Sequence, residues 1–207
     1  MRALRRPFQV IRADLRPYLV MNVVVYGLAL LGMALGMLFP DLYAARSAPV
    51  QAEDGWTSSL VMAVIDNVWT FAGTILLVNV FATALLLIVL PSLVVPFAGL
   101  VVFGLKTLDL GIVLAPVDAT ATKILLPHSL TLLIEFQAYV LVMLGAYLLG
   151  RSWLRPSTVG ASTRRQGYVG GLSRLGWLWV PAFVLFVVGA IYEAFEVLYL
   201  VPPLLAP

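Results

Sequence analysis

Long apolar runs bounded by charged residues or prolines constrain the fold of this chain more than any other feature. The first run, Tyr18–Phe39, can cross about 30 Å of hydrocarbon at about 1.5 Å per residue. Only 11% of residues are charged, whereas soluble proteins average about 25%. We therefore predict an all-α, polytopic transmembrane bundle, one domain over residues 1–207. About five spans are expected, at residues 18–39, 70–90, 95–115, 123–150 and 177–200.

The basic residues predict how the spans are oriented. Ten of the thirteen lie in two segments, residues 1–17 and residues 151–175. Cytoplasmic loops carry an excess of Lys and Arg, so both segments are expected in the cytoplasm. Residues 41–67 contain four acids and one arginine and are expected outside. This topology predicts a multi-pass protein of the cytoplasmic (inner) membrane with a cytoplasmic N-terminus.

Three polar segments receive more specific expectations. Residues 1–17 and the stretch Trp56–Trp69 have partly amphipathic spacing, which predicts interfacial helices. The Gly, Ser and Thr content of residues 151–175 predicts a flexible loop. Its arginines either serve topology alone or bind an acidic partner or anionic lipid. They are Arg151, Arg155, Arg164, Arg165 and Arg174. Basic residues that flank spans do not indicate nucleic-acid binding.

Four polar residues inside the apolar runs form the candidate site: His128, Glu135, Glu193 and Asn79. His128 is the only histidine, and Glu135 follows seven residues later, which places both on one helical face about 10 Å apart. A charge at the membrane centre costs about 2.5 to 3.5 kcal/mol, so such groups face protein or water. Three interpretations stay open: an interfacial histidine, a structural network between helices, or direct participation in transport or catalysis. Glu196, near the expected end of its helix, is assigned to the headgroups.

Other polar and small residues predict local contacts. Lys106 and Asp109 are three residues apart, which predicts an ion pair on one helix face, with a polar pore wall as the alternative. Gly32 and Gly36 predict a close helix contact. The pair Pro91 and Pro96 predicts the break between the second and third spans.

Several chemistries are disfavoured by the residues present. The chain has no cysteine and one histidine, so neither a thiolate site nor a site of several histidines can be built within it. Ser129 is adjacent to His128 but points about 100° away on a helix, which is poor geometry for a nucleophile and its base. A GxxxxGK[ST] loop is absent, so ATP-driven work would require a separate ATPase subunit. We predict no enzymatic activity, no metal and no cofactor.

Residues 70–205 resemble the stage II sporulation protein M family of integral membrane proteins. The resemblance rests on LLPHSLTLLIEFQAYVLVMLGAYLLG and AIYEAFEVLYLVPPLL, together with the position of Asn79. The matching residues are Pro127, His128, Glu135, Gly145, Gly150, Glu193, Ala194 and Phe195. The sequence departs from the family at Ser129, where glycine is more usual. Gly145 and Gly150 are expected at helix contacts.

The resemblance implies a non-catalytic membrane component that works with other membrane proteins in the bilayer. The first hypothesis is accordingly a scaffold or subunit of a larger membrane complex. The second is a permease-like transporter or exporter subunit in which the His/Glu residues line a polar path. A histidine near pKa 6.5 beside a carboxylate can exchange protons at physiological pH, which makes such a path chemically reasonable.

Overall fold

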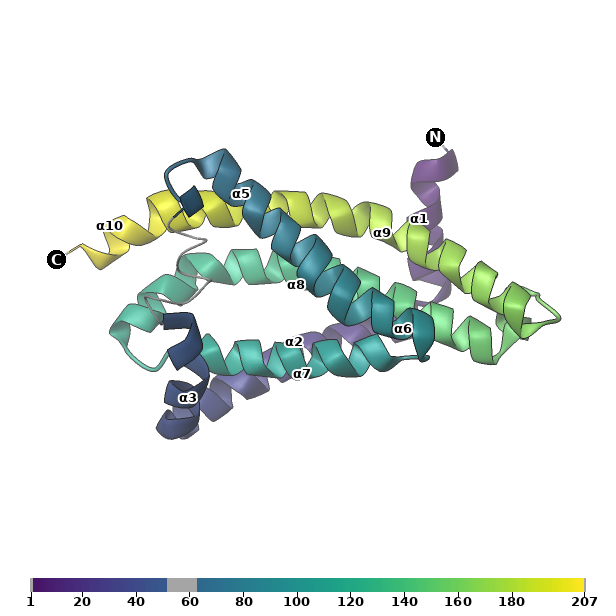
Figure 1. Cartoon of the computed structure of the whole chain (residues 1–207), viewed down its shortest axis with the longest axis horizontal. Helices are drawn as coiled ribbons and strands as arrows, with labels where there is room; N and C mark the ends of the chain where they lie inside the picture. The colour runs from purple at the N-terminus through teal and green to yellow at the C-terminus, as the bar shows by residue number, and fades with distance from the viewer. Residues whose placement is uncertain (1, 52–62, 207) are drawn as a thin grey trace.

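A computed structural model describes residues 2–51 and 63–206, and every regular element within these ranges is a helix. Figure 1 shows long helices that run back and forth along one axis. The predicted all-α bundle is confirmed. In chain order the long segments are α2 (Leu15–Leu38), α5 (Val68–Leu77) with η1 (Val78–Val89) and α6 (Leu90–Val94), α7 (Ala98–Val113), α8 (Ala119–Leu154), and α9 (Arg164–Phe195) with η3 (Glu196–Leu200) and α10 (Val201–Leu205).

Four of these segments are long and apolar enough to cross a membrane, which indicates a multi-pass membrane protein. They are Leu15–Leu38, Val68–Val94, Ala119–Leu154 and Arg164–Leu205. The expected third span corresponds to α7, which has 16 residues and is about 24 Å long. It runs along the bundle in the direction opposite to α5, η1 and α6 (Figure 1).

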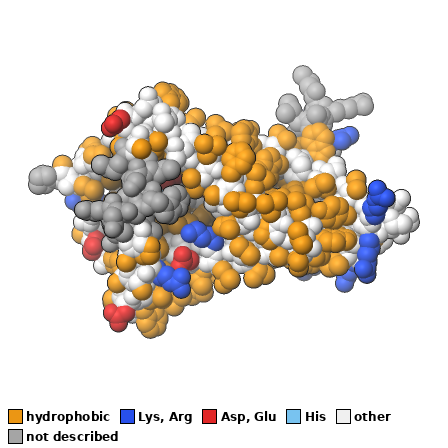
Figure 2. Space-filling view, viewed as in Figure 1, with side chains coloured by type: hydrophobic (Ala, Val, Ile, Leu, Met, Phe, Trp, Pro, Cys, Tyr) orange, Lys and Arg blue, Asp and Glu red, His pale blue; other side chains and the backbone are white. Residues whose placement is uncertain are grey.

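The two ends of the bundle differ in charge. Lys and Arg side chains gather at the end that holds the turn between α8 and α9, and Asp and Glu side chains lie toward the opposite end (Figure 2). We call the first the arginine end; it comprises α1 (Arg2–Ala13) and residues 155–165. The second is the acidic end, formed by α3 (Pro40–Gln51) and residues 114–118. The separation of charges follows from the alternating direction of the long helices.

Helix α8 forms the centre of the bundle because its neighbours cover most of its surface. Every residue from Ala138 to Ala146 is buried, and α8 as a whole packs against α9, α2, η1, α6 and α7. The contact between α8 and α9 is the most extensive. Leu144 and Phe186, one from each helix, are both fully buried. An apolar side chain of this size contributes about 1.5 to 3 kcal/mol when it leaves water.

Glycines allow the helices to approach closely at two contacts. A Cβ atom on Gly32 would lie 2.2 Å from the carbonyl oxygen of Leu108, so α2 and α7 can meet only with glycine there. Gly36 lies at the same contact. On α8, Gly145 faces Leu175 and Gly150 faces the ring of Phe97. Of the four glycines expected at helix contacts, Gly32, Gly36 and Gly145 lie at one, and Gly150 packs against Phe97 in the turn before α7.

The arginine-rich segment differs from its expected flexible loop over residues 151–175. Helix α8 continues to Leu154, a short 3-10 helix, η2, covers Pro156–Val159, and α9 begins at Arg164. Two of the glycines that suggested flexibility, Gly167 and Gly171, are packing positions: a Cβ on Gly171 would lie 2.7 Å from the Cα of Leu149. Small residues here bring α9 against α8 instead of loosening the chain.

The other connections are also more helical than expected. Residues 41–51, predicted as part of an outside loop, continue in α3, while most of the predicted helix Trp56–Trp69 lies outside the described residues. Helix α1 covers most of the expected N-terminal tail and lies across the end of the bundle (Figure 1). The helix before the third span passes through Pro91, and the chain turns at residues 95–97, where Phe97 has φ 69°.

Candidate functional site

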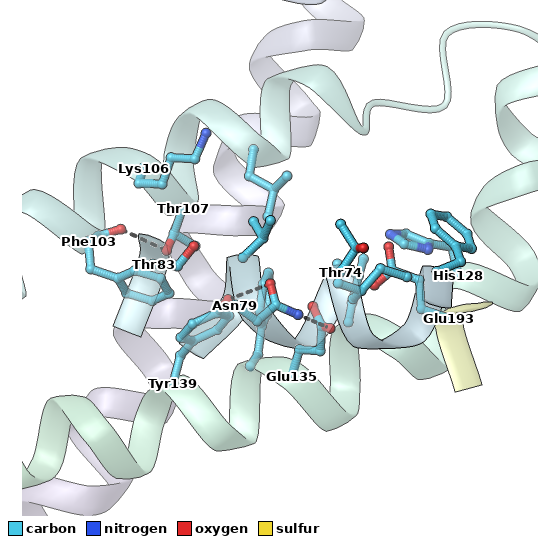
Figure 3. Close-up of a pocket in the computed structure, with 16 residues that line it drawn as sticks. Thr74, Asn79, Thr83, Phe103, Lys106, Thr107, His128, Glu135, Tyr139 and Glu193 are labelled. Atoms are coloured by element: carbon cyan, nitrogen blue, oxygen red, sulfur yellow. Dashed lines mark hydrogen bonds between the residues drawn. The ribbon is translucent and has the colours of Figure 1, made fainter. Parts of the chain in front are cut away.

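A cavity of about 430 Å³ lies among α5, η1, α7, α8 and α9. Its walls are mainly apolar and include the rings of Phe71, Phe103 and Phe136. Polar groups converge on it from four of the long segments (Figure 3). They belong to Thr74, Asn79, Thr83, Lys106, Thr107, His128, Glu135, Tyr139 and Glu193. An apolar pocket with a few convergent polar groups is the usual form of a small-molecule site.

Asn79 reaches the cavity from η1, which is a π-helix of 12 residues. Such segments are wider than an α-helix, are uncommon at this length, and often occur at functional sites. Asn79 and Thr83, four residues apart, both line the cavity. The side-chain oxygen of Asn79 accepts a hydrogen bond from the Tyr139 hydroxyl at 2.9 Å, and its amide donates to Glu135. These two bonds connect η1 to α8 across the cavity wall (Figure 3).

Glu135 on α8 and Glu193 on α9 form a carboxyl pair. Both side chains line the cavity, and Glu193 lies one helical turn beyond Gly189, which packs against Glu135. Gly189 makes room for this arrangement, because a Cβ there would lie 2.9 Å from Cγ of Glu135. Two carboxylates in contact cannot both ionise without a compensating positive charge. The pair can therefore hold a proton or a cation.

His128 is bonded to Glu196 and not to Glu135. Its Nδ1 atom lies 3.0 Å from a carboxylate oxygen of Glu196, and the hydroxyl of Thr131 donates to the other oxygen. Glu196 is completely buried, so its assignment to the headgroups was wrong. The helical segment continues to Leu205, nine residues beyond Glu196, which keeps this carboxylate inside the bundle. The burial of Glu196 could have been predicted from its three-residue spacing from Glu193, because this spacing puts both side chains on neighbouring positions of one helix face.

The expected pair of Lys106 and Asp109 is replaced by a different one. Asp109 binds Arg46 at 3.0 Å, because α3 packs against α7 and brings its arginine to this position. Lys106 instead lines the cavity. In Figure 3 it lies at one end of the group of labelled side chains, and His128 lies at the other. The cavity thus has a cation toward one end and acidic groups along the rest.

A second polar cluster, between α2 and α8, was largely missed by sequence reasoning. Its centre is Gln137, which accepts from the Tyr18 hydroxyl at 2.9 Å and donates to Asn22 at 2.6 Å and to Tyr26 at 3.1 Å. Tyr26 in turn donates to the carbonyl of Leu133. Since these groups satisfy one another, the cluster is a structural contact between helices.

The five candidate arginines fall into two groups. Arg151 and Arg174 bind the buried carboxylate of Asp14, at 2.7 and 3.5 Å, and thereby join α8 and α9 to the start of α2. The others, Arg155, Arg164 and Arg165, are exposed at the arginine end. Only this second group has the exposure that a contact with a partner or lipid requires.

Within the described residues, no cluster of three or more His, Asp or Glu side chains is arranged to hold a metal ion. No family model, no curated protein and no solved structure matches this chain. The function must therefore be argued from the cavity itself.

Proposed function

We propose that the protein is a permease-like membrane component that binds a small polar or charged solute in the cavity and passes it through the bundle. The observation that carries the proposal is the carboxyl pair Glu135 and Glu193 in the cavity wall, within helices that cross the membrane. Ionisable groups at membrane depth are expensive and are found mainly along substrate, ion or proton pathways. A purely structural role would not require a space of about 430 Å³ beside them.

The position of the cavity along α8 supports alternating access, in which the cavity opens first to one side of the membrane and then to the other. Its lining on α8 extends from His128 to Tyr139, toward the acidic end. From Val140 to Ala146 the same helix is apolar and fully packed. A solute in the cavity would therefore meet a closed segment toward the arginine end. Passage requires the helices around this segment to move apart, as in transporters that rock about a central site.

We further propose that the arginine end faces the cytoplasm of a bacterial-type inner membrane and that the acidic end faces outward. The charge difference between the two ends supports this orientation, because positively charged loops are retained in the cytoplasm. The N-terminus would then be cytoplasmic and the cavity would lie in the outer half of the bundle.

Thiol labelling tests the proposal directly, because the natural chain contains no cysteine. Thr83→Cys places one thiol in the cavity, and Phe81→Cys places a control on the outer surface, where Phe81 is 56% exposed toward the expected lipid. Only a thiol that meets water forms the reactive thiolate. A membrane-impermeant reagent should modify Thr83→Cys from either side of proteoliposomes and leave Phe81→Cys intact. Labelling from one side alone would argue against passage, and no labelling would argue against a water-filled cavity.

A scaffold or subunit role in a larger complex is the second candidate, as the resemblance to the stage II sporulation protein M family suggests. Its support is the exposed group Arg155, Arg164 and Arg165 at the arginine end. Purification in mild detergent from the native membrane should then retain other membrane proteins, and an ATPase among them would combine the two candidates. Charge reversal at Arg164 and Arg165 should release such partners. A chain that purifies without companions would contradict this role.

A further inference from the structure

We propose that the cavity takes an organic cation with an apolar body, and that this cation competes with a proton for the carboxyl pair Glu135 and Glu193. The inference rests on the proposed function, because it names the class of solute that the cavity would carry. It makes the protein a proton-coupled exchanger: one proton leaves the pair for each cation that binds.

The carboxyl pair carries the first step of the argument. In an apolar interior, a carboxyl group with no cation beside it is cheaper as the neutral acid. When a cation enters, the O–H bond of one carboxyl group of the pair breaks and the proton passes to water. That carboxylate then lies beside the positive charge, so the net charge of the site stays the same. Exchanging one positive charge for another avoids an uncompensated charge in a low-dielectric interior.

The walls of the cavity decide between an organic and an inorganic cation. Phe71, Phe103, Phe136 and Tyr139 line it with aromatic rings, whose faces attract a desolvated cation. An inorganic cation such as Ca²⁺ or Mg²⁺ needs about six or more oxygen ligands. The side-chain oxygen of Asn79, however, already accepts from Tyr139. The volume of about 430 Å³ falls in the range of pockets for small organic ligands, about 300 to 1,000 Å³.

Other charged groups near the pair fix the direction in which a cation would lie. Lys106 on α7 lines one end of the cavity, but it is exposed, and its ammonium group points away from the carboxyl pair (Figure 3). On the other side, His128 is held by Glu196, which can balance its charge. Tyr139 is the remaining titratable neighbour on α8, and its hydroxyl is bonded to Asn79. The cationic group is therefore expected beside Glu135 and Glu193, with its apolar substituents against the rings.

Tetraphenylphosphonium, a lipophilic cation that cannot itself donate a proton, is the probe. The full chain in nanodiscs should bind it more weakly as the pH falls, by up to about tenfold per pH unit, as competition with a single proton requires. In weakly buffered solution, binding should release about one proton per cation, read with a pH dye. The double variant that combines Glu135→Gln with Glu193→Gln should abolish the proton release. Asp109→Asn, which alters a carboxylate bound to Arg46 outside this pair, should keep it.

Three results would overturn the inference. Binding whose affinity does not change with pH would remove the competition with a proton. Unchanged proton release in the double glutamine variant would place the exchanging group elsewhere. Absence of binding at every pH, in a protein whose Thr83→Cys variant is labelled from both sides, would refute the cation while leaving the proposed function intact. Absence of both binding and labelling would remove the proposed function as well.

Discussion

The two halves of α8 show how one helix combines a polar site with a packed core. Between His128 and Tyr139 it carries charged and polar side chains and borders an empty volume of about 430 Å³. Between Val140 and Ala146 it is apolar, and every residue is buried. Both halves pack against α9, so the difference arises from the side chains and not from the fold. The polar half borders a cavity because its side chains need hydrogen-bonding partners. The apolar half packs without a cavity because its side chains need only apolar neighbours.

A buried charge should show the largest difference in stability between the two halves of α8. Leu144→Asp puts a carboxylate among fully buried apolar side chains and should cost about 5 kcal/mol or more in the free energy of unfolding. The matched change Leu132→Asp lies on the cavity wall of the same helix and should cost about 2 kcal/mol. Thermal unfolding and monodispersity in detergent measure both. Equal losses would mean that the cavity is no more polar than the core.

Glu196 provides the next largest effect within the polar half. Glu196→Leu leaves the bonding groups of His128 and Thr131 buried without an acceptor, at a cost of about 3 kcal/mol. Glu196→Gln keeps a carbonyl acceptor and should lose clearly less stability. The midpoint of thermal unfolding of the two variants gives the comparison. If leucine were tolerated as well as glutamine, the bonds to this carboxylate would not contribute to stability.

Substitutions of Glu135 should also be milder with glutamine than with leucine. The loss of stability should be smaller than at Glu196, because Glu135 has one hydrogen-bonding partner, Asn79, and Glu196 has two. Glu135→Leu strands the amide of Asn79 and should lower the free energy of unfolding by about 2 kcal/mol. Glu135→Gln retains a hydrogen-bonding oxygen and should be milder. Yield of folded protein and unfolding temperature measure the difference. Identical behaviour of the two variants would argue against a network between η1 and α8.

The ion pair of Arg46 and Asp109, which lies outside both halves of α8, should contribute least to stability. Arg46 is 56% exposed in its side chain, and exposed pairs are worth about 0 to 1 kcal/mol. Arg46→Ala should therefore shift the unfolding midpoint only slightly, and high salt should remove even that shift. A loss similar to that of Glu196→Leu would show that α3 and α7 depend on this contact for their packing.

Sequence reasoning found the helices because a membrane leaves few alternatives. A run of about 20 apolar residues must become a helix to satisfy its backbone, so the positions of α2, α8 and α9 follow from hydropathy. The polar residues of α8 and Asn79 also stood out, since polar groups are rare in such runs. Gly32 and Gly36 at the α2–α7 contact could be recognised by their spacing, whereas the glycines of α9 that pack against α8 were interpreted as a sign of flexibility.

What could not be predicted is which polar groups from distant segments meet. Asp109 pairs with Arg46 because α3 folds against α7, 63 residues away in sequence. Glu196 is buried and its helical segment continues past it, although prolines such as Pro202 and Pro203 normally interrupt a helix. Both outcomes depend on tertiary packing, which hydrophobic periodicity does not encode.

The π-helix η1 has a consequence for insertions and deletions. A wide segment of this kind contains more residues per turn than an α-helix, so the loss of one residue between Val80 and Val89 can be offset when the segment tightens. A regular α-helix such as α7 has no such reserve. A deletion there rotates every side chain before it by about 100° relative to those after it. Changes of length are therefore expected to disturb the cavity less in η1 than in the α-helices that surround it.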